Sequence, residues 1–262
     1  MTVSMIGSGN IAWHLTHVLE ENGVRVAELS LRNKANAASI IGYLYDVQIK
    51  TDLDFSHSPS SVFILAVSDN AVKKVAEEII LPPNAILVHT SGSLGLNVLL
   101  GTLVKNISAK IGVFYPLMTF TKGIKVDFRD VPMCIEGDDE SSYKVLNMMA
   151  YLISENVQVV SSHQRSVLHV AAVFACNFTN HLWALSKEIA EEEDLDFEIL
   201  KPLIQETFVK GMKASHPSQV QTGPAIRDDN ETISKHLALI RDDQDLIEVY
   251  NSVTKSIQNW HQ

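Results

Sequence analysis

The strongest chemical signal in the chain is the stretch GSGNIA, residues 7–12, which directly follows a short apolar run. In the spacing GxGxxA the first glycine permits a tight turn and the second lets a pyrophosphate approach the backbone. The small third residue lets the next helix pack on its strand, and the helix N-terminus faces the negative charge. The pattern predicts a dinucleotide site made by Gly7, Ser8, Gly9, Asn10 and Ile11; a strand-to-helix turn without a ligand is the alternative.

The residues at the end of the next strand favour NADP over NAD. An NAD site usually has an acidic residue there for the ribose 2′-hydroxyl, whereas an arginine accommodates a 2′-phosphate. The chain has Ser30, Arg32 and Asn33 at this position, and its nearby acid, Glu28, falls inside the predicted strand. We therefore expect these three residues to bind the 2′-phosphate; a solvent-facing arginine is the alternative for Arg32.

Small and hydroxyl residues follow two later strands. In an open α/β sheet, ligands bind beyond the carboxyl ends of the strands, so these residues are expected to leave room for a nicotinamide ribose. They are Ala66, Val67 and Ser68 after one strand and Thr90, Ser91 and Gly92 after the next. Asp69 is expected to cap the following helix rather than to act in catalysis. His89, at the strand end, is a second candidate for contact with the substrate.

Polar residues interrupt an apolar helical segment in the second half of the chain. At about 100° per residue, Asn180 falls within about 20° of His169, and Asn177 about 80° away. Polar groups on the buried side of a helix require partners, and a substrate could be that partner. We expect His169 to donate a proton during hydride transfer, with Asn177 and Asn180 orienting the substrate. A core histidine bonded to a backbone carbonyl or an asparagine is the alternative.

Residues 215–230 lack periodicity, and their Pro, Gly and Asn content indicates a loop. Within it, Arg227 follows Gly-Pro and could bind a substrate carboxylate or a cofactor phosphate. The alternative is an ion pair with Asp229, with Asp229 or Asn230 capping the next helix.

The elements that must position these residues fall into two halves. Up to about residue 160, short β-branched runs alternate with amphipathic stretches, which predicts a doubly wound parallel sheet in an α/β domain, residues 1–160. The expected strands are Thr2–Ile6, Val24–Leu31, Val47–Ile49, Val62–Val67, Ala85–His89, Lys110–Phe114, Pro132–Glu136 and Val157–Val160, and the expected helices are Asn10–Glu21, which Gly23 ends, Asn36–Tyr43, Asn70–Ile80 and Ser141–Ser154. Residues 161–262 predict an all-helical domain with helices at Gln164–Glu193, Phe197–Ala214, Thr232–Leu239 and Asp243–Asn259.

The composition favours a small-molecule partner. A formal net charge of -10, without a cluster of Lys and Arg, disfavours nucleic acid or an anionic membrane. Cys134 and Cys176 lack the spacing of a zinc or redox site, so we expect buried thiols in a reducing cytoplasm, with no metal and no disulfide. Neither a signal peptide nor a membrane span is predicted at the N-terminus, because glycines and Asn10 interrupt its apolar run.

With these residues in hand, the chain resembles the two-domain family in which a Rossmann-like domain precedes a domain of unknown function, DUF2520. The stretches that carry the resemblance are GSGNIA at Gly7, HTSGS at His89, YPLMTF at Tyr115, LHVAAVFACNFTNHL at Leu168 and TGPAIRDD at Thr222. Members are labelled NADP oxidoreductases or coenzyme F420-dependent NADP oxidoreductase-like proteins. More distantly, the plan is similar to the pyrroline-5-carboxylate reductase and 6-phosphogluconate dehydrogenase superfamily.

The resemblance implies an NADP-dependent hydride-transfer enzyme with its active site in an interdomain cleft, and a homodimer formed through the helical domain. The hydroxyacid dehydrogenases of the superfamily carry a catalytic lysine on the first long helix of the second domain, followed one turn later by asparagine. This chain has no lysine from Gln164 to Ser186, so that acid–base mechanism does not transfer.

The expected function is therefore reduction or oxidation of a small carbonyl, imine or hydroxy compound with NADP. A non-catalytic NADP(H)-binding sensor or scaffold is the second hypothesis, because the superfamily lysine is missing. Oxidoreduction between coenzyme F420 and NADP is the third.

Overall fold

The computed structural model describes residues 1–32, 38–42, 44 and 46–261. Its contacts divide the chain into two compact units, Met1–Ala172 and Val173–Gln262. The strands end earlier, with β8 (Val157–Val159), and helix α6 (Ser162–Ala172) belongs to the first unit. The change to helical structure thus falls near residue 160, as expected, whereas a domain boundary at that residue stays a prediction.

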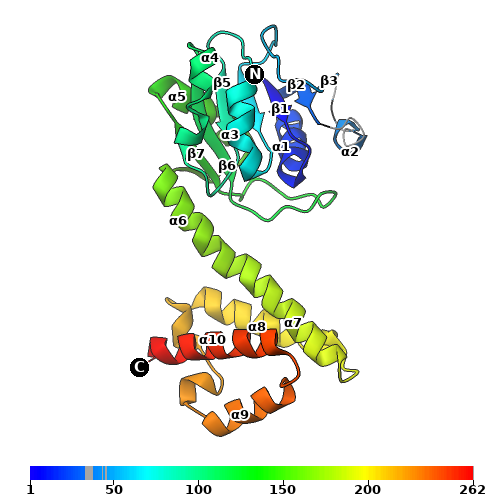
Figure 1. Ribbon diagram of the computed structural model, residues 1–262, viewed down its shortest axis with the longest axis vertical. Helices are drawn as coiled ribbons and strands as arrows, with labels where there is room; N and C mark the ends of the chain where they lie inside the picture. Colours follow the sequence, from blue (N-terminus) through cyan, green and yellow to red (C-terminus); the bar gives the residue numbers. More distant parts are fainter. Residues whose placement is uncertain (33–37, 43, 45, 262) are drawn as a thin grey trace. The chain divides into compact units, whose positions relative to one another are not determined.

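An eight-stranded sheet in the order β3-β2-β1-β4-β5-β6-β7-β8 forms the centre of the first unit (Figure 1). Its other strands are β1 (Thr2–Ile6), β2 (Arg25–Ser30), β3 (Gln48–Lys50), β4 (Val62–Leu65), β5 (Ile86–His89), β6 (Lys110–Pro116) and β7 (Met133–Gly137). The predicted strands and the doubly wound α/β fold are confirmed. The pairing of β6 with β7 is antiparallel, which corrects the expectation of a wholly parallel sheet. Residues 117–132 join the two strands as a loop, and an antiparallel pair needs no crossover helix.

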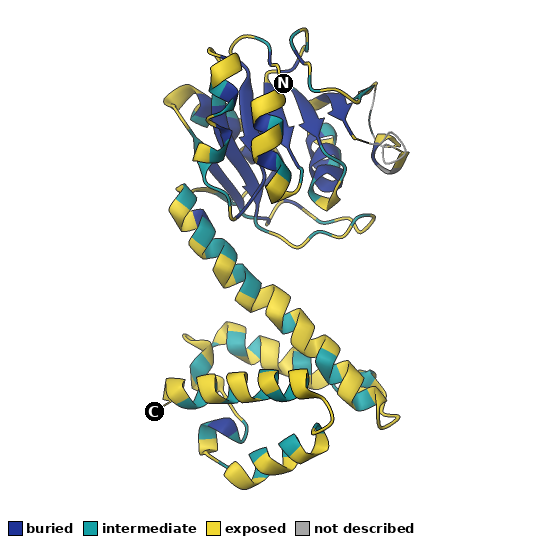
Figure 2. Ribbon diagram, viewed as in Figure 1, coloured by how far each residue is buried: buried dark blue, intermediate teal, exposed yellow. Residues whose placement is uncertain are grey.

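Helices cover both faces of this sheet because successive side chains of each strand point to opposite sides. Val3 and Met5 of β1 pack in one cluster with α1 (Asn10–Glu21) and α5 (Glu140–Ile153). Ile6 packs in a second cluster with α3 (Asp69–Glu78) and a 3₁₀ turn at Leu96–Leu99, next to α4 (Thr102–Lys105). The inner strands β2, β1, β4, β5, β6 and β7 are therefore largely buried (Figure 2), whereas the edge strands β3 and β8 are more exposed. The short α2 (Ala38–Ile41) precedes β3.

Gly23 ends α1 as the sequence predicts. Its φ of 77° lies in the left-handed region, which a glycine adopts without steric cost. The backbone N–H of Val24 then reaches back to the carbonyl of Leu19 at 2.9 Å, the bond that closes a Schellman motif. The chain leaves the helix here and enters β2, so the end of α1 sets where β2 begins.

The second unit is helical, as predicted. It contains α7 (Thr179–Glu191), α8 (Lys201–Lys213), α9 (Asn230–Leu239), α10 (Gln244–His261) and a π-helical segment, Val173–Phe178. Short 3₁₀ turns lie at Phe197–Ile199, Pro217–Val220 and Ala225–Arg227, so the predicted loop at residues 215–230 contains two of them. Across the described residues, none of the helices has the length and apolar character to cross a membrane.

Candidate functional site

The candidate cofactor residues lie along one edge of the sheet. Strands β2, β1, β4 and β5 run in parallel and end at Ser30, Ile6, Leu65 and His89. The order of the strands reverses between β1 and β4, where α1 and α3 leave toward opposite faces. This reversal point at the carboxyl ends is where open α/β sheets bind their ligands.

The glycine loop after β1 has the shape that a pyrophosphate requires. Gly7 has a φ of 127°, and a Cβ there would lie 2.1 Å from the carbonyl oxygen of Ala66, so no other residue fits. A Cβ on Gly9 would meet no atom within 4 Å, which leaves the backbone open to a ligand. Gly9 precedes the first turn of α1, which holds no acidic residue. The N–H groups at the start of α1, among them those of Asn10 and Ile11, form with the loop at Ser8 and Gly9 a positively polarised cradle for a phosphate, whereas the N–H of Gly7 donates to the carbonyl of Ser30 at 3.0 Å.

The end of β2 supports only part of the predicted 2′-phosphate contact. Arg32 is exposed just beyond β2 and is free to bind an anion. Ser30 is 5% exposed, and its hydroxyl donates to the carbonyl of Asp52 at 2.9 Å, so the structure engages it inside the protein instead. Asn33 lies outside the described residues. Arg32 is therefore the residue to test at this position.

Asp69 joins the ends of β4 and β5. Its carboxylate accepts hydrogen bonds from Ser93 at 2.6 Å and from Ser91 at 3.0 Å. The predicted helix cap is wrong, because Ser68 stands at the N-cap of α3 and makes no side-chain cap bond. Asp69 instead holds the loop that contains Gly92. Of the residues predicted to face the cofactor, Val67 is half-buried and Ser68 is exposed, whereas Ala66, Thr90, Ser91 and Gly92 are buried.

His89 is buried at the end of β5. It is 0% exposed, and its Nδ1 accepts the backbone N–H of Ser91 at 3.1 Å. Burial, together with the nearby charge of Arg165, lowers the pKa of His89 to about 4, so the imidazole is neutral at pH 7. In this structure His89 supports the loop from within, and its contact with the substrate stays a prediction.

His169 lies against the loop that follows β5. Its Nδ1 is 3.2 Å from the hydroxyl of Tyr115 on β6. A Cβ on Gly92 would come within 2.6 Å of the same nitrogen, so the imidazole occupies the space that this glycine leaves free. The loop, β6 and α6 thus bring together three residues that are distant in the sequence.

Tyr115 keeps its own proton beside His169. Burial raises the pKa of Tyr115 to about 12, so the phenol is protonated at neutral pH and can donate a hydrogen bond to Nδ1. When Nδ1 itself carries a proton, it can donate to the phenol oxygen instead, so the two side chains stay hydrogen-bonded in either case. The stretch YPLMTF contains Tyr115, but no local spacing in the sequence links it to a residue on α6.

A buried arginine fixes the start of α6. Arg165 is 0% exposed, and its guanidinium donates to Glu136 Oε2 and to the carbonyl of Leu94, each at 2.6 Å. Glu136 also accepts the hydroxyl and the backbone N–H of Ser162, at 2.8 and 3.1 Å. Since Arg165 lies about one helical turn before His169, this ion pair sets where His169 lies. The pattern of the chain gave no signal for Arg165.

The predicted residues of the second unit are exposed. The common face of His169, Asn177 and Asn180 was derived from a regular α-helix, but the π-helical segment Val173–Phe178 intervenes and changes the period. Asn177 and Asn180 are exposed, so the expectation of buried polar groups is wrong.

Arg227, in the loop before α9, is also exposed, and Asp229 caps α9 by accepting the N–H of Thr232 at 3.1 Å. Substrate contacts by Asn177, Asn180 and Arg227 stay predictions.

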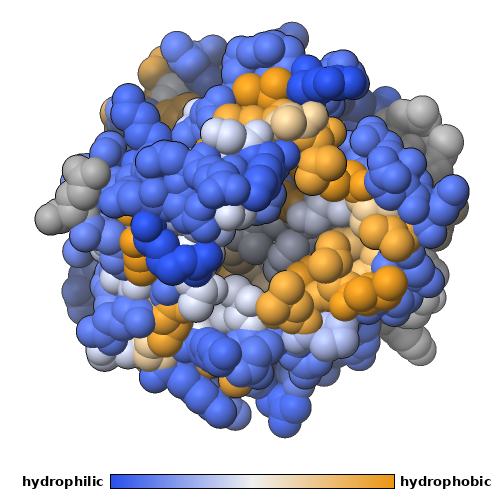
Figure 3. All heavy atoms as spheres, turned by 90° about the horizontal axis from the view of Figure 1, so that it is seen from below, coloured by the Kyte–Doolittle hydropathy of each residue, from blue (hydrophilic) through white to orange (hydrophobic). Residues whose placement is uncertain are grey.

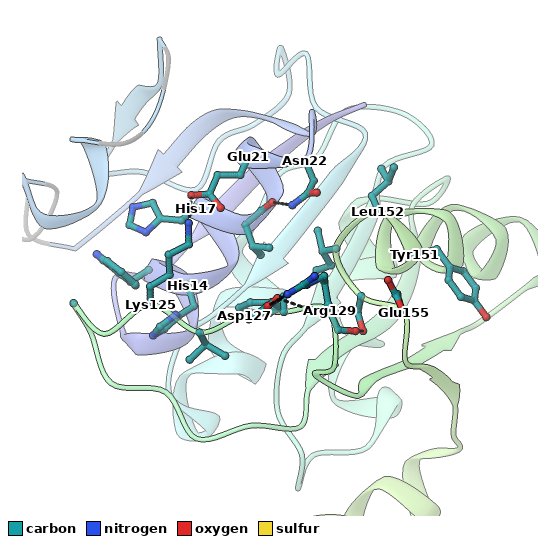
Figure 4. A pocket seen from close by; sticks show the side chains of 17 residues that line it. His14, His17, Glu21, Asn22, Lys125, Asp127, Arg129, Tyr151, Leu152 and Glu155 are labelled. Atoms are coloured by element: carbon teal, nitrogen blue, oxygen red, sulfur yellow. Dashed lines mark hydrogen bonds and ion pairs between the residues drawn. The ribbon is translucent and has the colours of Figure 1, made fainter.

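A cavity of about 930 Å³ lies beside α1, the loop after β6 and the end of α5 (Figure 4). Its wall on α1 runs from Trp13 to Asn22 and does not include the glycine loop. Lys125 pairs with Glu21 at 2.8 Å, and Arg129 pairs with Asp127, so the cations already have partners. Burial lowers the pKa of His14 and of His17. These contacts explain the charged residues of the cavity without a ligand.

The two cysteines lie in different environments. Cys134 is buried as expected, whereas Cys176 is exposed, since the helical segment that carries it is not covered within the chain. No group of metal-ligating side chains occurs among residues 1–32, 38–42, 44 and 46–261.

The chain is similar to a known protein family and to solved structures. Residues 131–257 match the model of a domain of unknown function, DUF2520. A crystal structure described as a "putative NADP oxidoreductase" from Bacteroides fragilis is 34% identical, with 98% of each chain covered and a TM-score of 0.89. No curated protein sequence matched the chain.

More distant structures share the fold. A reductive aminase from Aspergillus terreus in complex with NADPH is 11% identical, covers 100% of this chain and 96% of its own, and has a TM-score of 0.73. An imine reductase from Myxococcus stipitatus in complex with NADP+ is 14% identical, with 98% and 93% covered and a TM-score of 0.65.

The doubly wound sheet and the glycine cradle define a Rossmann-type dinucleotide-binding protein with a helical C-terminal part. Within that class, the chain belongs to the family of the Bacteroides fragilis protein, in which DUF2520 follows the Rossmann-like part. The resemblance expected from the sequence is thereby confirmed.

Proposed function

We propose that this protein transfers hydride between NADP(H) and a small carbonyl, imine or hydroxy compound. The chain is an NADP-dependent oxidoreductase by its family and its cofactor edge. The observation that best supports the finer proposal is the contact of His169 Nδ1 with Tyr115 at 3.2 Å beside Gly92. This contact supports a proton donor near the edge at which we expect the nicotinamide.

The cofactor supplies or accepts the hydride, and the chain's residues manage the proton and the binding. Reduction of a carbonyl or imine needs a proton at the oxygen or nitrogen as the hydride arrives at carbon. His169 acts as the acid in its protonated form: Nε2 gives its proton to the oxygen or nitrogen of the substrate, Nδ1–H stays hydrogen-bonded to Tyr115, and a neutral imidazole remains. Carbonyl and imine compounds are the first substrates to test, since proteins of this fold include a reductive aminase and an imine reductase.

A panel of keto acids, ketones and cyclic imines, incubated with NADPH and with NADH, tests this proposal. We expect steady oxidation of NADPH with at least one compound, and the loss of NADPH absorbance measures it. NADPH that binds but is never consumed would instead favour a sensor or scaffold, the second hypothesis raised by the missing lysine.

The preference for NADPH should depend on Arg32. Removing its guanidinium in Arg32→Ala should weaken NADPH binding by roughly 10- to 100-fold, because a charge-assisted hydrogen bond contributes about 1.5–3 kcal/mol. NADH has no 2′-phosphate, so its affinity should not change. Titration of both cofactors measures the ratio, and an unchanged ratio contradicts the assignment.

The helical unit supports the further proposal of a homodimer. Among the described residues of this unit, Ala225 is the one apolar residue in the buried set. Large side chains such as Phe174, Phe208, Met212 and Trp260 are 63–67% exposed in the single chain. Apolar residues also form patches on the face that Figure 3 presents. A helical unit without its own core requires a partner, and a second copy supplies the same apolar surface.

Sedimentation equilibrium should therefore give twice the chain mass of 29.0 kDa. Phe208→Glu on α8 should shift the protein toward the monomer, since a buried unpaired charge is costly at an apolar interface. Lys213→Glu on the same helix is the matched control and should leave the dimer intact. A monomer for the unaltered protein at micromolar concentration would contradict the proposal.

A further inference from the structure

The loop between β6 and β7 contacts the start of α1 through three consecutive residues. The side chain of Asn10 donates to the carbonyl of Phe120 at 2.8 Å. The Nε2 of His14 lies 3.1 Å from the carbonyl of Thr121. Lys122 then donates from Nζ to the carbonyl of Ser8 at 3.5 Å. The loop is thus held beside the residues that form the glycine cradle.

Aromatic packing keeps this part of the loop in place. The ring of Phe120 stacks on Phe128, with centroids 5.6 Å apart, and lies 4.6 Å from the ring of His14. Phe128 is itself buried in the core beneath α1. The position of Lys122 therefore follows from packed neighbours on both sides of the loop.

Lys122 has no carboxylate partner in the part of the chain that the structure describes. Among the ion pairs of the described residues, none includes Lys122, whereas its neighbour Lys125 pairs with Glu21 at 2.8 Å. Its Nζ contacts the neutral carbonyl oxygen of Ser8 at 3.5 Å, which is long for a hydrogen bond, and the first turn of α1 carries no acidic residue. A half-buried ammonium group in such a place is suited to an anion.

We propose that Lys122 is the counter-charge for the pyrophosphate of the bound dinucleotide. The proposal rests on the proposed function, because it assumes that GSGNIA holds the cofactor. Lysine is a compact point charge on a flexible stem, so a small movement of Nζ from the Ser8 carbonyl brings it to the phosphate. The N–H groups of the glycine cradle would supply neutral donors to the phosphate, and Lys122 would add a positive charge from the loop between β6 and β7.

Binding of NADPH and of NADH to purified full-length variants, measured by calorimetry, tests this role without requiring turnover. NADPH and NADH share the pyrophosphate, so Lys122→Ala should raise both dissociation constants by roughly 10- to 100-fold. Arg32→Ala should raise only that of NADPH. Lys122→Arg keeps the charge and should bind within a few-fold of the unaltered protein.

Lys125→Ala is the matched control on the same loop, since Lys125 is exposed and already paired. It should bind both cofactors normally.

The outcomes separate the two proposals. If the unaltered protein binds NADPH and Lys122→Ala binds both cofactors as tightly as the unaltered protein does, the role of Lys122 is wrong and the proposed function stands. If the unaltered protein binds neither cofactor, the proposed function fails first. Thermal unfolding of each variant shows whether weak binding comes from a lost contact or from a lost fold. If Lys122→Ala is destabilised and binds weakly, Lys122→Arg decides the question. A stably folded Lys122→Arg that also binds weakly contradicts the proposal.

Discussion

His169→Ala lowers kcat by about 100- to 10,000-fold and leaves the dissociation constant of NADPH nearly unchanged: this is the expected result if His169 donates the proton. General acid catalysis by a positioned side chain contributes a factor of about this size. The cofactor constant should not change because His169 adjoins Gly92 and Tyr115, not the glycine loop at residues 7–9. Steady-state kinetics on the best substrate of the panel, with a separate cofactor titration, measures both quantities.

His163→Ala is the matched control, since His163 is an exposed histidine on the same helix. It should keep full activity. Tyr115→Phe retains the ring but loses the hydroxyl that orients His169, so its kcat should fall by a smaller factor, about 10-fold for one neutral hydrogen bond. Undiminished turnover in His169→Ala would contradict the role of His169 as the proton donor.

Arg165→Met destabilises the first unit by about 3–5 kcal/mol, because it leaves the carboxylate of Glu136 without its partner. For a unit of this size, such a loss lowers the melting temperature by about 6–20 °C. The same change releases the start of α6 from the carbonyl of Leu94, and His169 lies on that helix. We therefore expect kcat to fall while the KM for NADPH stays nearly constant, which distinguishes lost positioning from general damage to the fold.

The exposed pair of Arg129 and Asp127 provides the control for this buried pair. Arg129→Met should change the melting temperature little, since solvent screens exposed ion pairs. In the double variant Arg165→Met with Glu136→Met, stability should recover because no unpaired charge remains, but the position of α6 should stay altered. Recovery of stability without recovery of kcat supports the positioning role of Arg165. A normal melting temperature for Arg165→Met alone would contradict it.

Much of the fold follows from patterns between near neighbours. Thr2–Ile6 and Asn10–Glu21 match β1 and α1, and Gly23 adopts the left-handed conformation expected of a helix end. These features depend on residue types a few positions apart, so they are readable from the chain. The antiparallel return from β6 to β7 was missed, because direction depends on how residues 117–132 cross the sheet.

The candidate site shows the same difference between features set by near neighbours and features set by distant contacts. The turn at Gly7 and the open backbone at Gly9 follow from one local motif, and the role of Arg32 at the next strand end stays a prediction. Asp69 was misassigned as a cap because its serine partners lie on the next strand's loop. The face shared by His169 and Asn180 was inferred from a regular helical period, which the π-helical segment interrupts.

By itself, the sequence determined an α/β half built around a dinucleotide loop and a helical half, and it predicts that Arg32 binds a 2′-phosphate. The tertiary structure decided which distant groups meet: Tyr115 with His169, Glu136 with Arg165, and Lys122 with the loop at Ser8. The physical reason is that turns and periods arise from interactions within a few residues. A buried ion pair or a hydrogen bond between distant segments forms only when sheet order and packing bring both partners to one place and exclude water from them.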